Sequence, residues 1–198
     1  MLNQNKIEPD CFIEFKKKNS PKNYERDCDH AVRECLREAL LKEQRGQCFY
    51  CEQKIRISRI DHFIPRNAPK ENDIECNYNN LFLSCNRKES CDIFKGNKFD
   101  ESKYIRLFSN SYDIETPSDF FDYTTKGKIK PKRILSDDKK RRAENTIEFL
   151  NLNHNELINA RKVMFKNIES YKRSGLDIKT IYSYFEEFES IFKKFGEL

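Results

Sequence analysis

Two pairs of cysteines are the residues whose spacing most strongly indicates chemistry. Cys48 and Cys51 form a CxxC pair, and two thiolates at that spacing can bind one tetrahedral zinc ion from a tight turn. Cys85 and Cys91 follow further along the chain. Together the four residues predict a closed, structural Zn²⁺ site that stabilises a small domain. A CxxC pair by itself would also fit a redox pair or a chance spacing.

An acid–histidine pair lies between the two cysteine pairs. Asp61 and His62 are adjacent, so on a strand their side chains would point to opposite faces. The imidazole of His62, with a pKa near physiological pH, is suited to take a proton from water. The carboxylates of Asp61 and Asp92 are hard oxygen donors of the kind that Mg²⁺ or Mn²⁺ prefers. The plainer alternative is that Asp61 and His62 simply end a half-buried strand.

The order of these elements resembles the HNH, or ββα-metal, nuclease family. Zinc-bearing members read CxxC, then Asp/Glu-His, then Asn-Leu, then a second cysteine pair that runs into Asn/His-x-x-Lys. The matching residues here are Cys48/Cys51, Asp61-His62, Asn80-Leu81, Cys85/Cys91 and Asp92-x-x-Lys95-Gly96. The chain departs from the family at Asp92, which stands in place of Asn or His, and in the longer spacing of the second cysteine pair. Asn86 is a competing candidate for that last ligand position.

The resemblance implies an α+β fold and a hydrolytic function. The expected fold is a small zinc-bound ββα core flanked by α-helices at both ends. In this family His62 would act as the general base that cuts a phosphodiester bond, while Asp61 and Asp92 would hold one catalytic Mg²⁺ or Mn²⁺. Asn80 would brace the adjoining loop and orient the histidine.

Longer segments extend the resemblance to a particular branch of the family. The stretches LLKEQRGQCFYCEQKI, NYNNLFLSC, FKGNKF and NTIEFLNLNHNELINARK look like the HNH component of bacterial ATPase-linked anti-phage systems, the PtuB-type nucleases of Septu and related retron modules. That resemblance implies an ABC/SMC-like ATPase partner of the PtuA type. The chain contains no GxxxxGK[ST] motif, so any nucleotide dependence would come from the partner.

Positive charge permits binding to nucleic acid but does not require it. The net charge is +5, and 36% of the residues are charged. The stretch from Lys126 to Arg142 is strongly basic, and it could follow a phosphate backbone or form a solvated loop. The candidate contacts are Lys95, Lys128, Lys130, Lys132 and Arg133. No residue pattern indicates base reading, so DNA and a structured RNA such as tRNA both remain possible substrates.

The remaining cysteines are not expected to form a disulfide framework. The sequence shows no targeting segment and no apolar run of membrane-spanning length, which favours a cytoplasmic location without membrane association. Thiols stay reduced in that compartment. Cys11, Cys28 and Cys76 have no evident partners, and Cys35 is expected to pack on the apolar face of a helix.

Periodicity divides the chain into four parts. We expect a polar segment over 1–26, a helix and the HNH core over 27–100, a basic irregular connector over 101–142, and a helical part over 143–198. The first helix should cover 27–45, with short strands near 104–108 and 120–123. Asn155 should cap a helix that ends near residue 170, and Asp177 should open a last helix that ends near residue 195. The aromatic stripe of the last helix should pack on residues 147–170, although it could dock on a partner.

A non-catalytic function is the alternative from a different class. A zinc-stabilised nucleic-acid-binding or adaptor module would keep the cysteines without needing Asp61, His62 and Asn80. Those three residues therefore favour the enzyme, whereas Asp92 in place of Asn or His favours the binder. A stand-alone restriction nuclease would need a sequence-reading domain, for which the chain has no evident room.

Overall fold

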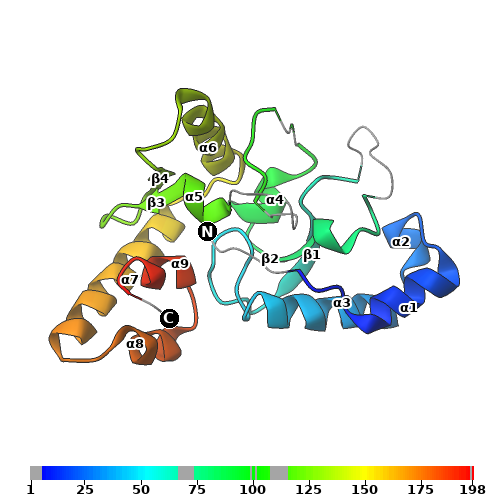
Figure 1. Ribbon diagram of the computed structural model, residues 1–198, viewed down its shortest axis with the longest axis horizontal. Coiled ribbons are helices and arrows are strands. Elements are labelled where there is room, and N and C mark those ends of the chain that lie inside the picture. Colours follow the sequence, from blue (N-terminus) through cyan, green and yellow to red (C-terminus); the bar gives the residue numbers. More distant parts are fainter. Residues whose placement is uncertain (1–5, 67–73, 99, 101, 108–115, 197) are drawn as a thin grey trace.

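Three helices precede the first strand in the computed structural model, which describes residues 6–66, 74–98, 100, 102–107, 116–196 and 198. They are α1 (Asp10–Asn19), α2 (Tyr24–Asp27) and α3 (His30–Glu43), and together they form an arm beside the small sheet (Figure 1). The carboxylate of Asp29 caps α3 by accepting from the Val32 N–H, as expected for a residue with a short acidic side chain at this position. The predicted helix over 27–45 is therefore confirmed with shorter bounds.

The polar N-terminal segment contributes to a second hydrophobic core. Phe12 of α1 and Leu36 and Leu40 of α3 are fully buried, because α1 packs along α3. Cys11 and Cys35 form a disulfide between these helices, with Cα atoms 6.7 Å apart. The predictions that Cys11 has no partner and that Cys35 serves only in packing are therefore wrong for this pair. Facing helix positions brought the two thiols together across 24 residues of sequence.

A ββα unit forms the centre of the molecule. Strand β1 (Ser58–His62) pairs antiparallel with β2 (Leu81–Cys85), and α4 (Cys91–Lys95) follows. In this register His62 lies opposite Leu81 and Asp61 lies opposite Phe82. Every residue of β2 is buried, because Leu81 and Leu83 face the core of the N-terminal helices while Phe82 belongs to the main core. The sequence-based expectation of a ββα arrangement matches this order of elements.

The connector is more regular than expected. It contains α5 (Pro117–Phe120), β3 (Phe121–Tyr123) and β4 (Ile129–Pro131), with β3 and β4 antiparallel. The predicted strand near 120–123 is confirmed. Residues 104–107 are not a strand, and Phe108, the end of that prediction, lies outside the described residues.

The C-terminal part consists of four helices, α6 to α9, in the described chain. They are α6 (Asp137–Phe149), α7 (Asn155–Arg173), α8 (Ile178–Phe185) and α9 (Glu189–Lys193). Helix α6 begins before the predicted start at Ala143, because Ser136 caps it through the Lys139 N–H. Asn155 is the first helical residue of α7 rather than its cap.

The predicted last helix, 177–195, is interrupted. Asp177 caps α8 as expected, but Glu186 and Phe188 adopt left-handed backbone angles between α8 and α9. The Phe188 N–H donates to the Glu52 carbonyl at 2.7 Å, so this turn is bonded to the residues that follow the CxxC pair. Phe188, Ile191 and Phe192 are buried. The aromatic stripe therefore packs within the molecule, as favoured from sequence.

None of the helices in the described parts of the chain combines the length and apolar character that a bilayer crossing requires.

Candidate functional site

The four predicted cysteine ligands converge on one point. All four sulfur atoms lie within 4.8 Å of one another, and every residue is buried. Sulfurs held by one tetrahedral zinc at about 2.3 Å would lie about 3.8 Å apart, and the Cys51 and Cys85 sulfurs are 3.9 Å apart. The donor set and its spacing therefore fit a structural metal such as zinc.

Local backbone geometry turns the CxxC pair toward the second pair. Residues 47–54, here called the knuckle, are closed by a bridge between Gln47 and Lys54, and the Cys48 N–H donates to the Gln53 carbonyl at 2.9 Å. Glu52 has a φ of +61°, which allows the chain to reverse directly after Cys51. These contacts place both thiols on the inner side of one turn.

The second cysteine pair comes from the ββα unit itself. Cys85 ends β2, and Cys91 is the first residue of α4. Cys91 has a φ of +62°, and its N–H donates to the Leu150 carbonyl at 2.9 Å. The wide spacing between the two cysteines is thus taken up by a loop that reaches from β2 to α4.

Contacts among the thiols favour negative charge on one sulfur, that of Cys48, and raise the pKa of the Cys51 and Cys91 thiols. Burial would raise the pKa of the Cys48 thiol, but hydrogen bonds from Cys51, Cys85 and Cys91 hold this pKa well below its usual range. The Cys85 N–H also donates to the Cys48 sulfur at 3.3 Å. A buried thiolate needs a compensating positive charge, which a bound Zn²⁺ would supply.

Asp61, His62 and Asp92 line a single cavity of about 280 Å³, here called the acidic pocket. Alternation along β1 sends Asp61 toward Lys95 of α4 and His62 toward Tyr24 of α2. Both residues are buried where they line the pocket. Asp92 enters from the first turn of α4. Asn86, the competing candidate for the last ligand, lines a different hollow, so the geometry favours Asp92.

The two carboxylates in the pocket are paired with cationic side chains. One Asp61 oxygen lies 2.8 Å from the Lys95 ammonium and also accepts the Tyr50 hydroxyl. One Asp92 oxygen accepts from Arg59 at 3.0 Å. Burial raises the pKa of Asp61 to about 7, with Lys95 opposing the shift and Asp92 adding to it. The pocket therefore brings together two carboxylates whose charges are balanced by neighbouring side-chain cations.

His62 is held in a defined tautomer. Its Nε2 lies 2.8 Å from the Glu75 carbonyl oxygen, and a carbonyl can only accept, so Nε2 carries the proton and Nδ1 keeps its lone pair. The Tyr24 ring meets the imidazole edge-on at 5.0 Å between centroids. Burial lowers the pKa of His62 to about 4, below the value near physiological pH that the sequence-based expectation assumed, so the ring is neutral at physiological pH but is a weaker base than expected.

Asn80 braces the loop that follows β1. Its side-chain oxygen accepts from the Ile64 N–H at 2.8 Å, and its amide donates to the carbonyls of Ile64 and Ile74 at 2.9 and 3.2 Å. Its backbone carbonyl accepts from the Phe63 N–H at 3.1 Å. Asn80 therefore fixes the segment on both sides of the loop that presents Glu75 to His62, consistent with the bracing role that the resemblance implies.

Lys95 corrects one sequence-based expectation. It was expected to meet a phosphate, but its side chain is only 1% exposed. The ammonium donates to the carbonyls of His62 and Phe63 at 2.6 and 3.3 Å as well as pairing with Asp61. It lies one helical turn after Cys91, so both side chains project from the inner face of α4. Lys95 ties α4 to the end of β1 and is not available to a substrate.

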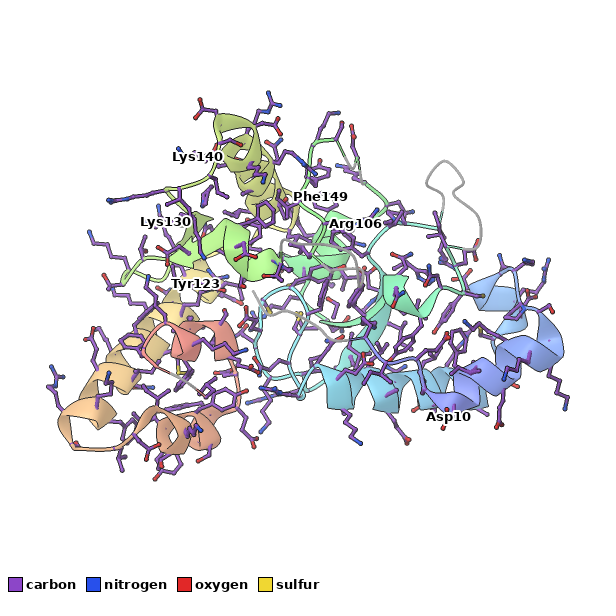
Figure 2. The ribbon with its side chains drawn as sticks, in the orientation of Figure 1. Asp10, Arg106, Tyr123, Lys130, Lys140 and Phe149 are labelled. Atoms are coloured by element: carbon purple, nitrogen blue, oxygen red, sulfur yellow. A yellow bond between two sulfur atoms is a disulfide. The ribbon has the colours of Figure 1, made fainter. Side chains whose placement is uncertain are left out.

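The basic stretch lies away from the acidic pocket. Lys128, Lys130, Lys132 and Arg133 belong to β4 and its flanking turns, and Figure 1 shows the β3–β4 pair on the other side of α4 from β1. Figure 2 places Lys130 and Lys140 on that same side, beside α6. Lys130 lies 3.7 Å from Asp122. A role of these residues in nucleic-acid binding stays a prediction.

Three residues of the site were missed from sequence. Arg59 lies two residues before Asp61, so strand alternation could have placed it on the same face. Tyr50 stands inside the CxxC pair, where its type alone gave no signal. Glu75 contributes a backbone carbonyl, which leaves no trace in the residue pattern.

Comparison with known proteins adds no family to this geometry: no protein-family model matches the chain, and no curated protein matches its sequence.

Proposed function

We propose that this protein is a metal-dependent endonuclease of the HNH kind that hydrolyses phosphodiester bonds in nucleic acid. The observation that carries the proposal is the convergence of Asp61, His62 and Asp92 on one cavity, from a strand and a helix in the order that the HNH resemblance implies. An imidazole with a free lone pair beside two carboxylates is a donor set suited to metal-assisted hydrolysis.

Each residue of the pocket has a separate task in this proposal. Nδ1 of His62 accepts a proton from the attacking water, while the Glu75 carbonyl keeps the opposite ring nitrogen protonated. Asp61 and Asp92 would hold the divalent ion, which would supply charge neutralisation at the phosphate and polarise the leaving oxygen. Asn80 holds the loop, and Lys95 holds β1 against α4.

The four cysteines Cys48, Cys51, Cys85 and Cys91, here called the thiolate cluster, contribute to this proposal by positioning α4 and take no part in the chemical step. Cys91 and Asp92 are adjacent at the start of α4, so a metal bound by the cysteines would fix the helix that presents Asp92. The two metals differ because soft thiolates select zinc and hard carboxylates select Mg²⁺ or Mn²⁺. A four-thiolate zinc has no open position for water or substrate.

The biological setting of the proposal comes from the sequence resemblance alone. The Septu-like and retron-like segments suggest that the nuclease is the effector of an anti-phage complex with an ABC/SMC-like ATPase. The described C-terminal helices pack on the core through Phe188, Ile191 and Phe192. The ATPase would therefore bind the outer surface of these helices rather than their apolar stripe.

A non-catalytic adaptor is the second candidate, and one observation favours it. Both pocket carboxylates already have cationic partners: Lys95 pairs with Asp61, and Arg59 pairs with Asp92. A pocket whose carboxylates are neutralised by neighbouring side chains could serve stability alone. The nuclease proposal requires that Arg59, which is largely exposed, give up Asp92 when the metal binds.

A cleavage assay separates the two candidates. Wild-type protein and the His62→Ala variant are incubated with plasmid DNA and with total tRNA, with Mg²⁺ or Mn²⁺, alone and with the partner ATPase. We expect cleavage by wild type and a loss on the order of 10²- to 10⁴-fold in the variant, the usual effect of removing a general base.

The chain offers matched controls because it has three histidines. His30→Ala, at an exposed position of α3, and His154→Ala, before α7, remove the same side chain away from the pocket and should cut as wild type does. Cleavage by neither wild type nor variant under any of these conditions, or by both equally, would leave the adaptor as the better reading.

A further inference from the structure

A second hollow lies at the opposite end of β1 from His62. This hollow, here called the basic groove, has a volume of about 650 Å³ and is lined by Lys54, Arg56, Cys85, Arg87 and Glu187 among others. It lies at the end of the sheet where β1 begins and β2 ends, because Ser58 lies opposite Cys85. The thiolate cluster therefore supports one wall of the groove.

The groove carries an excess of positive charge. Three of its lining side chains are cationic and one, Glu187, is acidic. Arg56 is exposed and makes no ion pair with any residue that the structure describes. Lys54 pairs with Glu186 and Arg87 with Glu156, and both acids are more than half exposed. Exposed pairs of this kind contribute about 0–1 kcal/mol, so a phosphate can replace the acid at little cost.

The acidic pocket is also bordered by arginines. Arg59 and Arg66 line it beside Asp61 and His62, with side chains 55% and 38% exposed. Arg59 precedes Asp61 by two residues on β1, so it lies on the face that leads from the pocket toward the groove. Arg59 pairs with the largely buried Asp92, whereas Arg66 pairs with the exposed Glu25.

We propose, on the basis of the nuclease function above, that a nucleic-acid backbone runs along β1 from the acidic pocket to the basic groove. The strand covers four residue steps between Ser58 and His62, or about 13 Å. Phosphates recur along each strand of a duplex every 3.4 Å or so of helix axis. The backbone winds around that axis, so successive phosphates lie farther apart than this rise, and the path spans fewer than about four nucleotides. Arg59 and Arg66 lie at the end with the proposed cut, and Arg56, Arg87 and Lys54 lie at the other end.

The chemistry of these residues fits a phosphate backbone. Arginine presents a planar fork that matches phosphate oxygens, and four of the five cations on this path are arginines. Strand β2 is buried along its whole length, so β1 and β2 do not form a free ribbon that could enter a groove of the duplex and read base edges. Binding through it should therefore depend strongly on salt and weakly on sequence. This path differs from the basic stretch Lys126–Arg142, which lies beyond α4.

A binding titration tests the path without cleavage. The His62→Ala protein is titrated by fluorescence anisotropy against a labelled DNA duplex of about 20 base pairs and an RNA hairpin of similar length, over a series of salt concentrations. Adding Arg56→Ala and Arg87→Ala together should weaken binding about tenfold and make the log–log salt slope shallower by about 2. The two probes show whether one backbone chemistry is preferred.

A matched pair controls for net charge. Lys166→Ala with Lys179→Ala removes the same two charges from exposed positions of α7 and α8 and should change binding less than twofold. Lys128→Ala with Lys132→Ala tests the competing basic stretch. The path is wrong if the control pair or the basic-stretch pair causes the larger loss, or if neither probe binds.

Cleavage measured in parallel keeps the two proposals apart. If the wild-type protein never cleaves but binding depends on the arginines, the nuclease proposal is wrong and the proposed backbone path stands. If the Arg56→Ala, Arg87→Ala protein cleaves with an unchanged KM, the proposed backbone path is wrong and the nuclease proposal stands.

Discussion

The thiolate cluster and the acidic pocket are neighbours built on the same elements, yet they are organised in opposite ways. Cys91 and Asp92 are consecutive, and one belongs to the cluster while the next lines the pocket. The four thiols are all buried, and the polar groups beside them are backbone N–H and serine hydroxyls from Ser84, Cys85 and Ser90. The carboxylates face an open cavity, and their partners are the side chains of Tyr50, Arg59 and Lys95.

That difference separates a site that holds structure from a site that can exchange ligands. A closed set of four donors leaves no position for water, whereas two carboxylates and an imidazole at a cavity leave room for a metal, water and substrate. The dependence between the sites runs one way. Loss of the cluster should release α4 and with it Asp92, whereas loss of a pocket residue should leave the cluster intact.

The largest expected effect comes from breaking the cluster. Cys48→Ser should remove the bound zinc and abolish cooperative unfolding, because structural zinc can contribute on the order of 10 kcal/mol, comparable with the whole stability of a domain. Zinc content by elemental analysis and thermal unfolding by circular dichroism measure both. Cys28→Ser, a buried thiol outside the cluster, should keep about one zinc per chain. A Cys48→Ser protein that folds and retains about one zinc per chain would show that the cluster is not the structural site described above.

The next effect concerns the ion pair that joins the pocket to α4. Lys95→Met should destabilise the protein by about 1–3 kcal/mol, because it removes the donor to the His62 and Phe63 carbonyls. Asp61, whose pKa is already about 7, would take up a proton when its cation is lost. Chemical denaturation measures the change, with the exposed Lys98→Met as a control expected within about 0.5 kcal/mol. If instead nucleic-acid binding fell while stability held, Lys95 would be a phosphate contact as first expected from sequence.

Local spacing explains which parts of the site could be predicted from sequence. A CxxC pair fixes two thiols in one turn, so the cluster was identifiable once Cys85 and Cys91 were added. Strand alternation correctly sent Asp61 and His62 to opposite faces of β1. These inferences need only the geometry of a single turn or strand, which follows directly from the spacing of residues in the sequence.

Contacts between elements explain what could not be predicted. The sequence places Lys95 one turn after Cys91 but does not say that this face of α4 meets β1. The break between α8 and α9 depends on a bond from Phe188 to the Glu52 carbonyl, and the Cys11–Cys35 disulfide depends on how α1 lies on α3. In each of these contacts the two residues are far apart in sequence, so a local sequence pattern cannot predict the contact.

A third prediction decides which residue completes the pocket. Asp92→Ala should lower metal-dependent cleavage on the order of 100-fold, because it removes one of two carboxylate donors. Asp92→Asn restores the residue type of the HNH pattern and should retain more activity than Asp92→Ala. Asn86→Ala tests the competing assignment and should lower cleavage less than Asp92→Ala, because Asn86 lines the basic groove rather than the pocket. Initial cleavage rates across a Mn²⁺ titration give the measurement, and a larger loss in Asn86→Ala would reverse the assignment.

The smallest effect tests how the C-terminal helices support the knuckle. The Ser190 hydroxyl donates to a Glu52 carboxylate oxygen at 2.7 Å, and that oxygen also accepts from Tyr123. Ser190→Ala removes one of these bonds and should cost about 1–2 kcal/mol, which lowers Tm by roughly 2–8 °C. Zinc release to a chelator should also become faster, because the knuckle can open more readily. Ser183→Ala, whose hydroxyl bonds only within α8, should change neither quantity. Equal release rates in both variants would mean that the cluster closes without help from α9.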